Sequence, residues 1–197
     1  MGSLAARLSR AGPAEPDRVR QMLDAAPHRG GHQQVREHGA VALGVSQDKE
    51  VTDSSISTGN GLVAAFSGRL DNAADLHQQL AAHGRAAAGD TPADIVEQAF
   101  RVWGEGAPAR LRGQFAAAVT DGERIWSFRD QVGFRAVYYR EDAAAVHLAS
   151  EAKQVLAGAG APTATGNRSC SWRPAASPPP RPSSVSPSCS IRRSGAA

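Results

Sequence analysis

The sequence has no cysteine before position 170. Its two cysteines, Cys170 and Cys189, stand alone near the C-terminal end and show no CxxC spacing. Isolated cysteines of this kind support neither a disulfide framework nor a zinc site. The six histidines are scattered, and the three residues between His28 and His32 include two glycines, which argues against metal ligation from one helix face. We therefore expect no metal site.

Long hydrophobic runs are also missing. No stretch of about 18 apolar residues occurs, so the sequence contains no candidate transmembrane helix. Two arginines near the start, Arg7 and Arg10, are not followed by the apolar segment of a secretory signal. Hydrophobic residues make up 41% of the chain and charged residues 21%, as in globular proteins. We expect a cytoplasmic protein without a membrane partner.

Acidic residues are absent after Glu151. Six of the 22 lysines and arginines lie beyond that position, which leaves 16 of them in residues 1–151. All 19 acidic residues lie in the same segment, so residues 1–151 carry a net charge of about −3. The overall charge of +3 thus comes from the C-terminal segment. A mildly acidic body binds nucleic acid poorly, so we expect no nucleic-acid partner. Binding of anionic partners through the basic tail stays open as an alternative.

The tail itself, residues 159–197, is rich in Ser, Pro, Arg and Ala and poor in apolar residues. Such a segment cannot bury enough apolar surface to offset chain entropy, so we expect it to be disordered. Two origins are compatible with the sequence. The tail is either a natural linker or an out-of-frame translation of GC-rich coding DNA, and the abrupt change after a clear helix pattern favours the second.

Strand and helix patterns alternate before the tail. Apolar strand patterns occupy residues 4–9, 39–45 and 62–68, and hairpin patterns centre on turns at 121–122 and 141–142. Helix patterns cover 15–26, 72–84, 90–106 and 150–160. Asp71 is the expected cap of the second helix, and residues 90–92 are the expected start of the third. This order predicts an α+β fold with antiparallel sheets.

Five stretches of the chain carry a resemblance to a known family. They are HRGG at 28–31, FSGRLDNAADL at 66–76, VWGEGAPARLRGQFAAAVTD at 102–121, SFRDQVGFRAVYY at 127–139 and LASEAKQVL at 148–156. In order and spacing they resemble the N-terminal class II glutamine amidotransferase domain of the asparagine synthase family. The resemblance covers residues 1–158. It implies a four-layer αββα N-terminal-nucleophile hydrolase fold with two stacked antiparallel sheets.

The resemblance assigns the position of the nucleophile to Gly2. In the family this residue is a cysteine whose thiolate attacks the amide of glutamine, and the ammonia passes to an ATP-using synthetase domain. Gly2 has no side chain, so we predict no catalytic residue and no glutaminase activity. β-Lactam synthetases and lasso-peptide cyclases keep this domain without the cysteine. A fragment of such an enzyme is therefore an alternative, as is an active glutamine-hydrolysing asparagine synthase subunit.

The glutamine pocket that the resemblance implies is altered as well. Gln47 aligns near the arginine that binds the substrate carboxylate, and an amide cannot make that ionic contact. Ser67, Gly68 and Arg69 replace Asn-Gly-Glu, which leaves only the Gly68 backbone N–H for the oxyanion hole. Pro92 stands where an aspartate should hold the substrate amino group, although an aspartate lies two residues earlier.

Other residues of these motifs have a structural interpretation. We expect Arg129 and Asp130 to form an ion pair that stabilises the fold. Gly113 is expected to relieve crowding where a strand begins. Residues 150–154 are expected to cap a helix and to form part of its solvated face. None of these positions needs a catalytic role to explain its residue type.

The Ser-Gly-Gly-x-Asp-Ser phosphate loop of a synthetase domain does not occur in the sequence. ATP and Mg²⁺ would belong to that missing domain, and we expect no cofactor in this chain. We expect the parental gene to encode a two-domain ATP-dependent amide-forming enzyme. The chain would be its degenerate amidotransferase-like part, with a structural or docking role. The expected partner is a synthetase domain or subunit.

Overall fold

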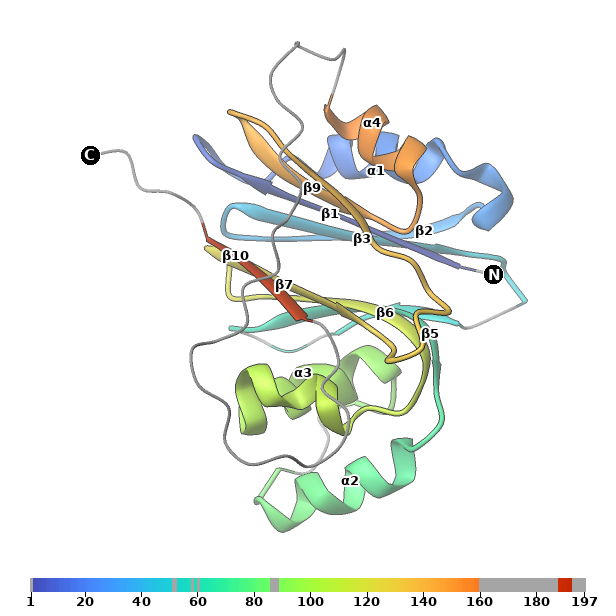
Figure 1. Ribbon diagram of the computed structural model, residues 1–197, viewed down its shortest axis with the longest axis vertical. Coiled ribbons are helices and arrows are strands. Elements are labelled where there is room, and N and C mark those ends of the chain that lie inside the picture. The colour runs from blue at the N-terminus through green and yellow to red at the C-terminus, as the bar shows by residue number, and fades with distance from the viewer. Residues whose placement is uncertain are drawn as a thin grey trace.

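The computed structural model describes residues 2–50, 53–57, 59, 61–85, 89–159 and, by their backbone, 188–192. Two five-stranded antiparallel sheets are stacked between two layers of helices (Figure 1). The strands of the first sheet are, in order, β2 (His32–His38), β3 (Val41–Gln47), β1 (Ser3–Ser9), β9 (Ala145–Ala149) and β8 (Tyr138–Glu141). Those of the second are β10 (Ser188–Arg192), β7 (Arg124–Arg129), β6 (Gly113–Thr120), β5 (Val63–Leu70) and β4 (Ser54–Ile56). The four-layer αββα arrangement predicted from the sequence is confirmed.

Helices cover the outer face of each sheet (Figure 1). On the first sheet lie α1 (Pro16–Asp24) and α4 (Ala152–Ala159), and against the second lie α3 (Pro92–Trp103) and, packed on α3, α2 (Ala73–Ala82). Two 3-10 helices, η1 (Pro27–Arg29) and η2 (Gly104–Arg110), follow α1 and α3. α3 begins as predicted, because Thr91 accepts a hydrogen bond from the Asp94 backbone N–H and Pro92 occupies the first turn.

The central strand β1 is buried on both faces, which explains its short, almost continuous apolar run. Leu4 and Leu8 belong to the core between the two sheets, whereas Ala5 packs with Val19 and Met22 of α1. Antiparallel pairing joins β1 to β3 on one side and to β9 on the other. The first residues of the chain therefore lie at the centre of the first sheet.

Three features differ from the sequence-based expectations. Strands β2 and β4 were not predicted, because β2 is polar and half-exposed and β4 has only three residues. Asp71 does not cap α2: Asn72 precedes that helix and its side chain makes no capping hydrogen bond, while Asp71 pairs with Arg69. Ser188–Arg192, part of the tail expected to be disordered, forms β10 by antiparallel pairing with β7. The rest of that tail, including Cys170, lies outside the described residues.

Candidate functional site

Four of the residues that the sequence singles out meet at one end of the sandwich, between the two sheets. Gly2 directly precedes β1, and Gln47 is the last residue of β3, the strand paired with β1. Ser67 and Gly68 lie on β5 of the opposite sheet, where Ser67 pairs with Ser54 of β4. The site is thus built from both sheets, and the segment at the start of β4 lies between them.

Gly2 is buried and has no room for a side chain. A Cβ atom at this position would lie 2.0 Å from Ser54 Oγ, 2.6 Å from Asp53 Oδ1 and 2.6 Å from the Ser46 carbonyl oxygen. The Gly2 backbone N–H donates to both carboxylate oxygens of Asp53, at 3.1 and 2.9 Å. Any residue other than glycine would have to displace Asp53 and Ser54.

Ser54 is bonded to two residues of the altered pocket, Gln47 and Ser67. Its backbone N–H donates to Gln47 Oε1 at 3.0 Å, and its hydroxyl donates to Ser67 Oγ at 3.1 Å. Ser54 and Ser67 are almost fully buried. The neighbouring Asp53 carbonyl accepts a hydrogen bond of 2.6 Å from the Gly68 N–H. The polar groups of Gln47, Ser67 and Gly68 are therefore bonded to this one segment of the chain.

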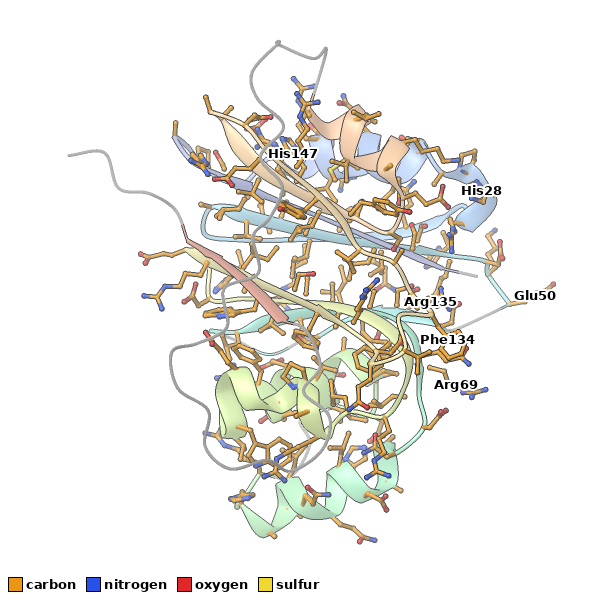
Figure 2. All side chains as sticks on the ribbon, viewed as in Figure 1. His28, Glu50, Arg69, Phe134, Arg135 and His147 are labelled. Carbon is orange, nitrogen blue, oxygen red and sulfur yellow. The ribbon has the colours of Figure 1, made fainter. Side chains whose placement is uncertain are left out.

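Arg135 joins the site from the loop between β7 and β8, and the sequence analysis missed it. Its Nη1 donates to the Gly2 carbonyl at 3.2 Å, and its Nη2 lies 3.4 Å from Asp53 Oδ2. Figure 2 shows Arg135 between the two sheets, next to the loop residue Phe134. The motif SFRDQVGFRAVYY contains Arg135, but nothing in its pattern distinguishes this arginine as a residue of the site.

The loop that carries Arg135 is held by Asp130. Burial acts to raise the pKa of Asp130, but hydrogen bonds from the backbone N–H groups of Arg135, Phe134 and Gly133 outweigh it, so the pKa lies below its usual value. Those bonds are 3.1, 3.0 and 2.7 Å long. Backbone N–H groups of its own loop therefore hold the Asp130 carboxylate, while its backbone N–H donates to the Phe115 carbonyl. The predicted Arg129–Asp130 ion pair is not among its described contacts.

Arg69 and Pro92 lie outside the cluster around Gly2. The Arg69 side chain is 73% exposed, points away from the sheets in Figure 2, and pairs with Asp71, which raises the pKa of the guanidinium. Pro92 opens α3, and the N–H of the next residue, Ala93, donates to Ser55 Oγ of β4 at 3.2 Å. The first turn of α3 is therefore bonded to the strand beside the site, and the Pro92 ring itself offers no polar group.

A second polar cluster explains two of the sequence motifs. Glu151, which precedes α4, binds Arg29 Nε at 2.5 Å, His28 Nε2 at 2.8 Å and Lys153 Nζ at 3.3 Å. Burial acts to raise the pKa of Glu151, but these three donors outweigh it and lower the pKa to about 2. Glu151 thereby links HRGG to LASEAKQVL. Beside Arg29, Gly30 packs against the backbone of Gln47, so the cluster supports one wall of the site.

The described residues contain neither a metal-binding cluster nor a membrane-spanning helix. Within residues 2–50, 53–57, 59, 61–85 and 89–159, no group of three or more His, Cys, Asp or Glu side chains could hold a metal ion. In the part of the chain that the structure describes, no helix is long and apolar enough to cross a membrane.

Comparison with known proteins gives a consistent result. Residues 43–157 match a family model described as a glutamine amidotransferase domain. Glutamine-hydrolysing asparagine synthetase 3 of Bacillus subtilis (strain 168) is 28% identical over 101 residues, which cover 50% of this chain and 16% of that protein. The chain therefore matches only a small part of that relative's length, and Gly2 precedes the residues matched by the family model.

Two solved structures share the fold. Glutamine phosphoribosylpyrophosphate amidotransferase from B. subtilis, complexed with ADP and GMP, superposes with a TM-score of 0.61 at 17% identity, over 77% of this chain and 42% of that chain. A structure described as the allosteric regulatory enzyme of purine biosynthesis gives a TM-score of 0.61 at 17% identity, over 81% of this chain and 43% of the other. At this identity the likeness shows the fold alone.

Proposed function

Since the chain belongs to the glutamine amidotransferase domain family, we propose that it is a member whose glutaminase site is closed by its own residues and that it serves as a structural or docking domain. The family match covers residues 43–157, and the matched relative is an asparagine synthetase. The sequence-based recognition of this family is therefore confirmed. Inactivity and the docking role are the parts that we propose.

The observation that carries the proposal is the lack of space at Gly2. A nucleophilic cysteine needs a Cβ and a thiol directed at the substrate amide. A Cβ at Gly2 would lie within 2.6 Å of atoms of Asp53, Ser54 and Ser46. The site therefore lacks the nucleophile, and a side chain at Gly2 would require the Asp53 and Ser54 side chains to move and would lie close to the Ser46 backbone.

The stabilisation of a tetrahedral oxyanion would fail for a second reason. Such an intermediate needs N–H donors that are free to bind the developing charge. The Gly68 N–H already donates to the Asp53 carbonyl, and Ser67 Oγ is bonded to Ser54. Gln47, near the position of the carboxylate-binding arginine, accepts from the Ser54 N–H. Substrate would have to break all of these bonds in order to enter.

The partner that we propose is an ATP-dependent synthetase domain or subunit that forms amide bonds. The support is the match to an asparagine synthetase. The aligned region makes up only 16% of that protein, so most of its length lies outside the region that this chain matches. ATP and Mg²⁺ would bind to that partner. Asparagine as product, a lasso-peptide or β-lactam product, the cytoplasm as location, and binding of anionic partners through the basic tail stay predictions from the sequence.

The proposal is tested by assaying the purified full-length chain for glutamate release from millimolar glutamine. A heat-denatured sample is the blank, and an active class II amidotransferase assayed under the same conditions is the positive control. We expect the rate to equal that of the blank, because the nucleophile position is occupied by Gly2 and the oxyanion donors are engaged. Glutamate release above the blank would show that the site opens and that the proposal is wrong.

A further inference from the structure

The Asp53 carboxylate is bound at Gly2 in the manner of a ligand. Both of its oxygens accept from the Gly2 N–H, and Oδ2 also lies 3.4 Å from Arg135 Nη2. The other guanidinium nitrogen, Nη1, donates to the Gly2 carbonyl. The Gly2 N–H and one guanidinium nitrogen thus contact the same carboxylate, and a cation together with an N–H donor suits a carboxylate, which only accepts hydrogen bonds.

The donors of this arrangement are held in place without Asp53. Gly2 is held by the strand that follows it, because Ser3, the first residue of β1, pairs with Ser46 of β3. Arg135 is held because its loop is closed by hydrogen bonds to Asp130. The side chains of Arg135 and Asp53 are only 16% and 17% exposed, so their ion pair is shielded from water more than a surface pair is.

We propose that the Gly2 N–H and the Arg135 guanidinium form a carboxylate-binding site, and that Asp53 is its tethered ligand. The site is distinct from the Gln47 position, which the family resemblance relates to the substrate carboxylate. When the Asp53 carboxylate is bound, it holds the start of β4 next to Gly2. Ser54, the residue after Asp53, then lies against Ser67. The inference concerns binding only and holds whether or not the domain hydrolyses glutamine.

The test is chemical rescue of the variant Asp53→Ala in the full-length chain. The substitution removes one carboxylate group, and formate is a free carboxylate of matching size. We expect formate to raise the midpoint of thermal unfolding of D53A in a saturable manner, whereas chloride at the same ionic strength does not. In D53A/R135Q the apparent affinity for formate is expected to fall by about tenfold or more, because the charge-assisted bond is lost.

The matched controls are the wild-type chain and Ser54→Ala. Both keep Asp53 in the site, so formate is expected to have no saturable effect on either. Equal stabilisation of all variants, or no difference between D53A and D53A/R135Q, would overturn the proposal. If D53A does not fold in chloride, its refolding yield in formate becomes the measurement. A yield that formate raises in D53A but not in D53A/R135Q supports the site, and a yield unchanged by formate contradicts it.

Discussion

At the scale of single residues, Gly2 decides what the site can do. Its backbone N–H holds Asp53, and the missing side chain leaves room for Ser54, whose hydroxyl donates to Ser67 of the neighbouring strand β5. In the family that the sequence resembles, a cysteine at this position would need that same space. The missing side chain of Gly2 and the positions of Asp53 and Ser54 thus depend on each other, because a side chain added at Gly2 would meet both residues.

The variant Gly2→Cys tests this coupling. The new Cβ would meet Ser54 Oγ at 2.0 Å, so we expect the free energy of unfolding to fall by about 1–3 kcal/mol, as for other overpacked positions. We also expect no glutamate release, because the thiol has no open pocket. Chemical denaturation measures the first effect. Gly31→Ala is the control, since nothing lies within 4 Å of a Cβ there, and its change should stay within about 0.5 kcal/mol. A stable G2C protein that hydrolyses glutamine would refute the coupling.

The sequence predicted part of the site. Gly2, Gln47, Ser67 and Gly68 were identified because motif spacing aligns them with a known pocket, and the structure brings them together through Ser54. Asp53 and Arg135 were not identified. They are 82 residues apart in the chain, and only the stacking of the two sheets makes them neighbours. Their charge pairing leaves no trace in periodicity or composition.

At the scale of elements, Glu151 connects the turn η1 with the start of α4. His28 and Arg29 come from η1, and Lys153 comes from α4. Gly30, the residue after η1, adopts a φ of +110° and packs on the backbone at Gln47. The position of η1 therefore affects the position of the last residue of β3. The two sequence motifs therefore have a structural role in supporting the site wall.

The variant Glu151→Gln tests this link through its pH dependence. The folded-state pKa of about 2 lies below the ordinary value of 4.5, so the ionised carboxylate stabilises the fold above pH 4.5, and this contribution is lost as the pH falls toward 2. We expect E151Q to be less stable than wild type by about 1 kcal/mol at pH 7, a modest value because His28 and Lys153 are half-exposed. The difference should shrink below pH 4.5, as measured by denaturant unfolding.

The control for that series is Asp71→Asn. It removes an ion pair whose members, Arg69 and Asp71, are 73% and 46% exposed. Because both side chains are largely in water, we expect D71N at pH 7 to be as stable as wild type within the error of the measurement. If E151Q behaves like D71N, Glu151 does not hold η1 to α4 in solution, and the structural interpretation of the two motifs is wrong.

Elements with strong periodicity were predicted well, and those defined by pairing were not. α3 shows an apolar face of Ile95, Val96, Ala99 and Phe100, and its start carries a Thr cap and a proline. By contrast, β2 has little apolar content because its side chains are partly exposed, and it is a strand because β3 supplies its hydrogen bonds. β10 likewise exists through pairing with β7.

At the scale of the whole molecule, the stacking of two sheets creates the site. β1 and β3 bring Gly2 and Gln47 from one sheet, and β4 and β5 bring Ser54, Ser67 and Gly68 from the other. Asp53 bonds to both sheets at this end of the sandwich, because its carboxylate accepts from the Gly2 N–H and its carbonyl accepts from the Gly68 N–H.

The most direct test of this account is a crystal structure of the full-length chain determined after soaking with glutamine at high concentration. The account predicts the Asp53 carboxylate on the Gly2 N–H, the Asp53 carbonyl on the Gly68 N–H, and no glutamine between Gly2 and Gly68. Glutamine density in that space, with Asp53 and Ser54 displaced, would contradict the claim that the domain closes its own site.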